Sequence, residues 1–205
     1  MELIWRGHSC FVLQVGGFRL MLDPYKEVTG LPDIAGDTVD AVLCSHGHRD
    51  HCYTDELHIL GGTAPFGCER VSTFHDGEGG ALRGINTVHR LTAEGITVVH
   101  LGDLGHRLTT EQLSAVTPCD VLLLPVGGTY TVDHRQAKAV MEQIRPRVTV
   151  PMHYRDGERG YEVLEPVETF LAQFSPELVR RYGSNTLTLA PDMPKQIAVL
   201  TYQGQ

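Results

Sequence analysis

Long apolar runs are missing from this sequence of 205 residues. None approaches the roughly 18 residues that a membrane-spanning helix needs. Residues 1–10, MELIWRGHSC, lack the basic start and apolar middle of a signal peptide. We therefore expect a soluble, cytoplasmic protein with no membrane partner. Low-complexity tracts, internal repeats and linker-like stretches are also missing, which predicts a single domain over residues 1–205.

Lysine is scarce, with only Lys26, Lys138 and Lys195 in the chain. Aspartate and glutamate together number 25 against 17 lysines and arginines, so the formal net charge is -8. Proteins that bind nucleic acid rely on a basic face. The acidic balance therefore counts against nucleic acid as the main partner and favours a small molecule.

Cysteine is neither abundant nor paired in a recognisable motif. The five cysteines are scattered and include no CxxC spacing. An odd number of scattered thiols in a cytoplasmic protein predicts reduced cysteines rather than a disulfide framework. Cys52 lies beside a histidine cluster, where a packing role is favoured over a reactive or metal-binding one.

The hydrophobic pattern predicts layered sheets and helices. Apolar alternation indicates early strands at residues 3–5, 10–15 and 18–23, with a Gly16-Gly17 hairpin turn, and then a buried strand within residues 39–46. Further strands are expected at 69–76, 85–93, 96–100, 120–126, 147–154, 185–190 and 196–202. Helices are expected at 54–60, 109–116, 133–146 and 167–174.

Residues 44–55, CSHGHRDHCYTD, crowd histidines and aspartates together directly after an apolar run. Side chains two residues apart in an extended segment point to the same side, so His46 and His48 can converge on one metal ion. Asp50 and His51 follow at the turn and can face a second ion. A solvated polar turn is the alternative explanation of this stretch.

Three further candidates stand at the ends of predicted strands. His75 follows VSTF, Asp103 follows ITVVHLG, and His153 follows RVTVPM. Residues at the end of a strand are held by a rigid sheet and lie next to a loop, which is a common position for functional residues. None of the three indicates a metal site alone; the indication comes from their order along the chain together with residues 46–51.

Residues 46–51, HGHRDH, resemble the HxHxDH signature of the metallo-β-lactamase superfamily, and TFHDGEGG, HLGDLGH and VPMHY resemble its later metal-binding segments in the same order. The likeness is greatest to the small metal-dependent hydrolases that include ascorbate-6-phosphate lactonase. The resemblance implies an α/β fold, a four-layer αββα sandwich with two divalent ions. It implies that His46, His48 and His75 bind the first ion, that Asp50, His51 and His153 bind the second, and that Asp103 bridges them.

The expected activity is hydrolysis of an ester, lactone, amide or phosphodiester bond in a small molecule by a hydroxide bound between two metal ions. The resemblance also gives Asp50 a catalytic part in orienting the nucleophile. Zinc is the default ion, with manganese or iron as alternatives. Alternative functions are an RNA or phosphodiester nuclease, a flavin-linked di-iron protein, and a non-catalytic metal-dependent binding protein.

Several residues near the motifs have open roles. Asp23 is expected to accept a ring N–H from a ligand histidine. For His8 in RGHSC, a structural hydrogen bond within the first hairpin is favoured over a place near the site. The roles of His106, Arg49, Tyr130 and Arg155 stay open, although an arginine near the ions would suit an anionic substrate. The oligomeric state is also left open.

Overall fold

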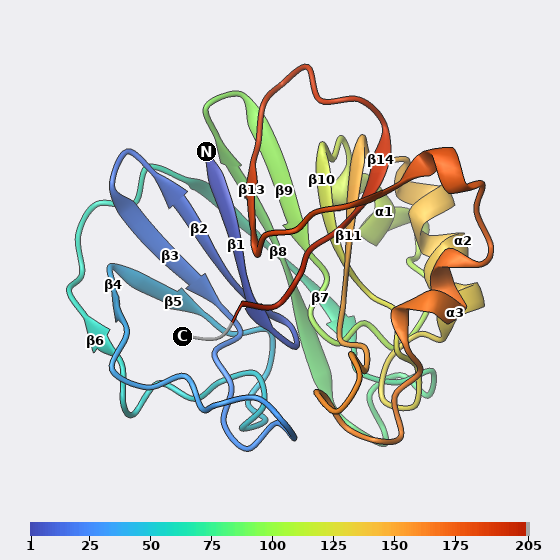
Figure 1. Ribbon diagram of the computed structural model, residues 1–205, viewed down its shortest axis with the longest axis horizontal. Helices are drawn as coiled ribbons and strands as arrows, with labels where there is room; N and C mark the ends of the chain where they lie inside the picture. The colour runs from blue at the N-terminus through green and yellow to red at the C-terminus, as the bar shows by residue number, and fades with distance from the viewer. Residues whose placement is uncertain (204–205) are drawn as a thin grey trace.

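A computed structural model describes residues 1–203 of the chain and contains two β-sheets that pack face to face (Figure 1). The first sheet has five strands, in the order β13 (Thr186–Thr188), β1 (Glu2–Gly7), β2 (Cys10–Val15), β3 (Phe18–Leu22) and β5 (Ala41–Leu43). The second has seven, in the order β12 (Val179–Arg181), β14 (Gln196–Val199), β11 (Val148–Met152), β10 (Val121–Pro125), β9 (Ile96–His100), β8 (Ile85–Ala93) and β7 (Gly67–Phe74).

The remaining elements are short. They are a parallel pair of two-residue strands, β4 (Thr38–Val39) and β6 (His58–Ile59), the helices α1 (Thr110–Val116), α2 (His134–Ile144) and α3 (Val167–Leu171), and a 3₁₀ turn at Pro176–Leu178. Within residues 1–203 there is no helix with the length and apolar character that a membrane crossing requires.

The main core lies between the two sheets. In β1 burial alternates, with Leu3 and Trp5 directed inward, as expected for a strand with one face on the core. Strands β10 and β11 are buried at every position, which matches their continuous apolar sequences. A second apolar cluster lies on the opposite face of β2 and β3, where Tyr25, Val28 and Ile34 pack against Val12 and Met21.

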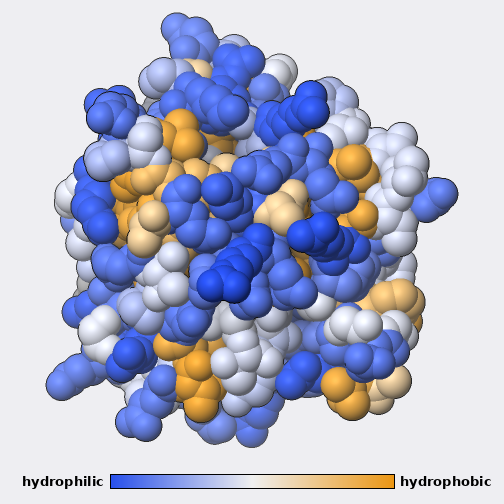
Figure 2. Space-filling model, turned by 90° about the vertical axis from the view of Figure 1, so that its right-hand side faces the viewer, coloured by the Kyte–Doolittle hydropathy of each residue, from blue (hydrophilic) through white to orange (hydrophobic). Residues whose placement is uncertain are grey.

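The three α-helices cover the outer face of the seven-stranded sheet (Figure 1). Thr109 and Asp133 cap α1 and α2 in capping boxes, which satisfies N–H groups that the first turn leaves free. Seen from the helical side, the surface is mostly hydrophilic with separate hydrophobic patches (Figure 2). The outer face of the five-stranded sheet is instead covered by the loop that runs through residues 24–39, so the fourth layer there is a loop and not a helix.

The helix predicted at residues 54–60 is wrong. The segment forms turns and strand β6, and its apolar side chains Ile59 and Leu60 are 49% and 70% exposed. Short helices are stabilised by an apolar face that packs on the core, and the exposed Ile59 and Leu60 show that this segment has no such packing. The other predicted strands and helices are present, whereas β12 and β4 were not predicted as separate strands.

Strand direction gathers the polar strand ends at one side of the molecule. Strands β1, β3 and β5 run parallel to one another, and β7, β9, β10 and β11 do the same in the second sheet. The carboxyl ends of parallel strands share one edge, so the residues that follow these strands can meet.

Candidate metal centre

The predicted ligands all follow carboxyl ends of strands, and both sheets contribute. The first sheet supplies His46, His48, Asp50 and His51 after β5, and the second supplies His75 after β7, Asp103 after β9 and His153 after β11. The sheets approach closely here: Gly102 has φ of 54°, and a Cβ at this position would overlap Ser45. Gly102 therefore lets the chain before Asp103 pass against the histidine-rich loop.

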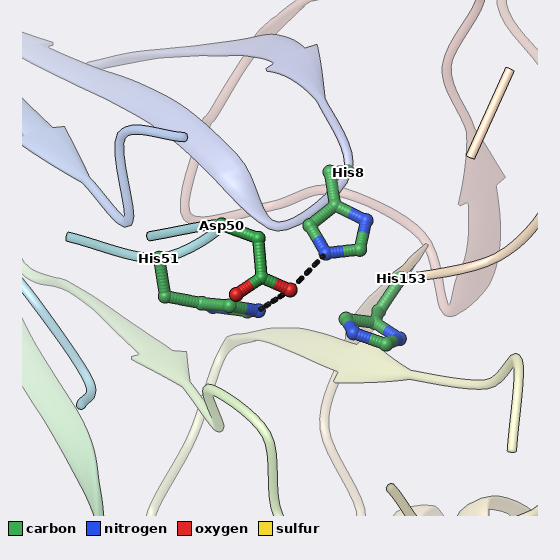
Figure 3. Close-up of side chains that lie close together, drawn as sticks. All are labelled: His8, Asp50, His51 and His153. Carbon is green, nitrogen blue, oxygen red and sulfur yellow. Dashed lines mark ion pairs between the residues drawn. The ribbon is translucent and has the colours of Figure 1, made fainter. Parts of the chain in front are cut away.

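The structure brings all seven residues together in adjoining clusters. Ligand atoms of His46, His48 and His75 lie within 4.8 Å of one another. A second cluster with the same spacing combines Asp50, His51, His153 and His8 (Figure 3). A third group, made of His46, His51 and Asp103, joins the two.

Asp103 is the residue at the centre. It is buried, and its carboxylate oxygens lie 3.2 Å from His51 Nε2 and 3.3 Å from the Nε2 atoms of His75 and His153. His51 Nε2 and His153 Nε2 nevertheless have no aligned hydrogen-bond partner among residues 1–203. Nitrogen and oxygen atoms that lie this close together without hydrogen bonds are arranged to bind a shared cation. Imidazole and carboxylate groups are ligands that suit zinc or a similar ion.

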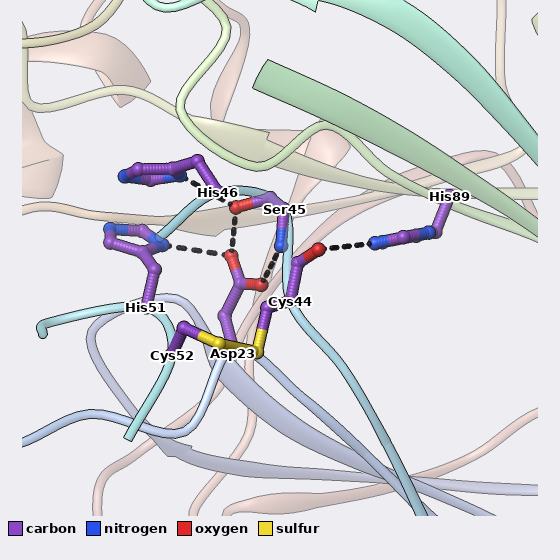
Figure 4. The surroundings of a disulfide bond; sticks show 7 residues. All are labelled: Asp23, Cys44, Ser45, His46, His51, Cys52 and His89. Atoms are coloured by element: carbon purple, nitrogen blue, oxygen red, sulfur yellow. Dashed lines mark hydrogen bonds and ion pairs between the residues drawn. A yellow bond between two sulfur atoms is a disulfide. The ribbon is translucent and has the colours of Figure 1, made fainter. Parts of the chain in front are cut away.

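Hydrogen bonds orient three of the histidine rings. His51 Nδ1 donates to Asp23 Oδ2 at 2.8 Å, which is the hydrogen bond predicted for Asp23 (Figure 4). Ser45 Oγ donates to Asp23 at 2.6 Å and lies 2.9 Å from His46 Nδ1. His75 Nδ1 lies 3.1 Å from the Tyr130 carbonyl oxygen. In each ring Nδ1 is occupied, which directs Nε2 to the cluster and fixes the tautomer a ligand needs.

Charge and burial set the protonation of these groups. Burial lowers the pKa of His46 to about 3, so its ring is neutral at neutral pH and ready to bind a cation. Burial also opposes the charged form of His51, but Asp103 and Asp23 outweigh it and raise the pKa of His51 well above its ordinary value. Burial raises the pKa of Asp23, whereas His100 and His51 lower it to a net value of about 2.

The expectation of reduced cysteines is wrong for Cys44 and Cys52, which form a disulfide (Figure 4). Their Cα atoms lie 5.3 Å apart, and the bond closes the loop that carries His46, His48, Asp50 and His51. His89, for which no role was predicted, lies with Nε2 3.0 Å from the Cys44 carbonyl oxygen. Cys10, Cys68 and Cys119 are free.

The clusters open into a pocket of about 290 Å³. Its lining residues are His48, Asp50, His75, Arg83, Asp103, Tyr130 and Tyr161. Arg83 was missed, although it follows His75 closely in the chain; its guanidinium carbon lies 5.6 Å from the centre of the Tyr130 ring. Tyr161 was also missed; burial and the Asp50 charge raise its pKa, so its hydroxyl stays protonated.

Asp76 organises the loop that carries Arg83. Its carboxylate accepts hydrogen bonds from the backbone N–H groups of Glu78, Gly80, Leu82 and Arg83. Although burial raises the pKa of Asp76, these donors outweigh it and lower the pKa to about 2. These hydrogen bonds fix the conformation of the loop after His75 and so set the backbone position of Arg83.

The other residues with open roles lie outside the pocket lining. Arg49 is exposed and pairs with Glu27 at 3.3 Å, and Arg155 is absent from the lining. His106 accepts a hydrogen bond from the Phe74 N–H at 3.1 Å and supports that strand end. The structural hydrogen bond favoured for His8 is contradicted, because neither of its ring nitrogens has a partner among residues 1–203.

Similarity to known proteins identifies the family. The family model of the beta-lactamase superfamily domain matches residues 2–153. The chain belongs to this superfamily. A UPF0173 protein from Pyrococcus furiosus is 30% identical over 207 residues, which cover 88% of this chain and 92% of that protein. A UPF0173 metal-dependent hydrolase from Carboxydothermus hydrogenoformans is 30% identical over 195 residues, covering 75% of this chain and 84% of that protein.

A solved structure supports the same assignment to the metallo-β-lactamase superfamily. A crystal structure from Thermotoga maritima, described as a candidate zinc-dependent hydrolase of this superfamily, is 35% identical. It covers 97% of both chains with a TM-score of 0.76. The expected fold class, an α/β sandwich of the metallo-β-lactamase fold, and the expected enzyme class, a metal-dependent hydrolase, are therefore confirmed. The finer likeness to ascorbate-6-phosphate lactonase stays a prediction.

Proposed function

We propose that this superfamily member uses two divalent ions, zinc in the first instance, to hydrolyse a bond in a small anionic molecule. The observation that carries the proposal is the convergence of the seven predicted ligands around Asp103, with the Nε2 atoms of His46, His51 and His153 left unpartnered. His46, His48 and His75 would hold one ion, Asp50, His51 and His153 the other, and Asp103 would contact both. Two such ions lower the pKa of a shared water and polarise the bond that is cleaved.

The pocket supports a small substrate. A volume of about 290 Å³ is at the small end of the range for ligand sites. Arg83 is the one cationic side chain of its lining apart from the histidines, and it can form paired hydrogen bonds with a carboxylate or phosphate. A lone arginine and a net charge of -8 make nucleic acid a poor match, so we propose a small molecule as the partner.

The remaining pocket residues have complementary parts. Asp50 lies at the pocket with 21% of its side chain exposed, so its carboxylate can accept a hydrogen bond from the attacking water and orient it. The protonated Tyr161 hydroxyl can donate a hydrogen bond to a substrate oxygen. These roles suit an ester, lactone, amide or phosphodiester substrate.

The test combines metal analysis with an activity panel. Purified protein, stripped and reloaded with zinc, manganese or iron, is assayed with neutral and carboxylated esters, lactones, amides and phosphodiesters. We expect hydrolysis that requires the ion and falls to background in Asp103→Ala, which should also bind less metal. Asp192→Ala, which removes an exposed carboxylate, is the matched control and should behave as wild type.

Two outcomes would contradict the proposal. Unchanged metal content and unchanged hydrolysis in Asp103→Ala would exclude this site as the catalytic centre. Two bound ions with no turnover across the panel would favour a metal-dependent binding protein instead.

A further inference from the structure

His8 lies against the site although it is remote in sequence from the other candidate ligands. It follows β1, and 2% of the residue is exposed. Its Nε2 lies 3.6 Å from Asp50 Oδ2 (Figure 3). Its ring centre lies 4.2 Å from that of His153 and 5.2 Å from that of His51. Its ligand atom lies within 4.8 Å of those of Asp50, His51 and His153.

The polar atoms of His8 are not satisfied by the protein. Neither Nδ1 nor Nε2 has a hydrogen-bond partner among the described residues 1–203. Buried polar groups normally have a partner, so an imidazole without one requires an explanation. The other rings around it, those of Tyr25 and Tyr161, meet it edge-on and offer it no hydrogen bond.

The backbone at His8 is also held in an unusual conformation. His8 has φ of 48° and His153 has φ of 52°, in the left-handed region that non-glycine residues seldom adopt. The two are tied to each other, because the His153 N–H donates to the His8 carbonyl oxygen at 3.3 Å. The same oxygen accepts a hydrogen bond from the Trp5 ring. Such conformations persist where the surroundings enforce them, and they concentrate at functional sites.

Resting on the function proposed above, we propose that His8 is a further nitrogen ligand of the ion held by Asp50, His51 and His153. This ion then has four donors besides the shared Asp103 carboxylate. The ion held by His46, His48 and His75 has three. Structural metal sites are closed by protein donors, whereas catalytic sites keep an open position.

The pocket has the same asymmetry. Its lining includes His48 and His75 from the first cluster, whereas from the second it includes only Asp50 and neither His8, His51 nor His153. The ion on the His8 side is therefore the enclosed one and should bind more tightly. The ion on the His48 side faces the pocket, keeps a position for water or substrate, and should exchange faster.

The experiment measures metal binding by metal-stripped His8→Asn. Asparagine is chosen because it tolerates the left-handed backbone at this position. Zinc titrated against a chromophoric chelator should show that the tighter site is weakened by about 10-fold or more, since even partners of a ligand change affinity by about 10–100-fold. The cobalt-loaded His8→Asn variant should differ from the cobalt-loaded wild type in its visible absorption, which reports the number of metal ligands. The exposed His58→Asn is the matched control and should match wild type.

Two results would overturn the role of His8. One is the finding that His8→Asn binds both ions with wild-type affinity and gives the wild-type cobalt spectrum. The other is a zinc-soaked crystal of the wild type in which His8 Nε2 is far from the roughly 2.0–2.1 Å expected of a zinc–nitrogen bond. The crystal gives an answer even if the variant does not fold. Wild-type protein that binds no ion at all would instead refute the proposed function.

Discussion

Replacement of Asp23 by asparagine tests how the ligand rings are held. The carboxylate accepts from the Ser45 N–H at 2.7 Å, from Ser45 Oγ at 2.6 Å and from His51 Nδ1 at 2.8 Å. An amide of the same shape has only one oxygen. If its nitrogen faces the Ser45 N–H, two donors oppose each other. If its nitrogen faces His51, the ring must carry its proton on Nε2, the atom directed at the metal centre.

The size of the effect follows from the charge environment of Asp23. A pKa lowered from 3.8 to about 2 corresponds to about 2 kcal/mol of stability in the metal-free protein. Because the pKa is lower in the folded state, this contribution is complete above 3.8 and is lost as the pH falls towards about 2. Asp23→Asn should therefore be less stable at neutral pH, and its difference from wild type should shrink under acid conditions. Metal affinity should fall by about 10–100-fold.

The assays are urea unfolding of metal-stripped protein over a pH series, and zinc competition with a chelator. Asp192→Asn, at an exposed aspartate, is the matched control. Asp23 does not hold the ligand rings if Asp23→Asn unfolds with the wild-type free energy at neutral pH and also binds zinc with wild-type affinity. If the loss of stability in Asp23→Asn stayed the same as the pH was lowered, the charge of Asp23 would not be its cause, although the effect on metal affinity could still hold.

Four other predictions concern the ions, the pocket and the loop. Removal of metal by a chelator should lower the free energy of unfolding by about 2.7 kcal/mol for each ion present at 100 times its Kd, and unchanged urea curves would contradict this. Zinc binding at neutral pH should release a proton from His51, whose pKa is raised in the metal-free protein, and calorimetry in buffers of different ionisation enthalpy would detect it. Arg83→Gln should raise KM for anionic substrates by roughly 10–100-fold, because a charged hydrogen bond is lost, and should leave KM for a neutral ester unchanged. Equal effects on the two substrates would rule out an anion-binding role for Arg83. Reduction of the Cys44–Cys52 bond should cost about 2–3 kcal/mol of stability, since it closes a short loop, whereas Cys68→Ser should cost nothing measurable.

Much of the fold and of the candidate site could be predicted because the signals are local. The alternating strands of the first hairpin and the buried strands β10 and β11 follow directly from residue pattern. The spacing of His46, His48, Asp50 and His51 is a continuous motif. The downstream candidates follow strand ends, where parallel strand direction alone places them at one edge.

What was missed depends on contacts that form only when the sheets pack together or when a loop folds back on itself. Nothing in RGHSC indicates that His8 meets His153, because that contact requires the two sheets to pack together. The disulfide between Cys44 and Cys52 depends on how the loop folds back, which its sequence spacing does not show. Arg83 reaches the pocket through a loop whose shape is set by four hydrogen bonds to Asp76. The failed helix at 54–60 was predicted from a cap and a short apolar segment, which are weak signals without a supporting face.

Both candidate ion sites combine loops from the two sheets, and this has a consequence for the rate of unfolding. His46 and His48 follow β5 in one sheet while His75 follows β7 in the other, and the second cluster likewise joins His51 to His153. The sheets therefore cannot separate while ions bridge them. We expect that resistance of the metal-loaded protein to proteases and heat is a kinetic property, governed by the rate of metal release, and that it is long-lived even where the equilibrium gain in stability is modest.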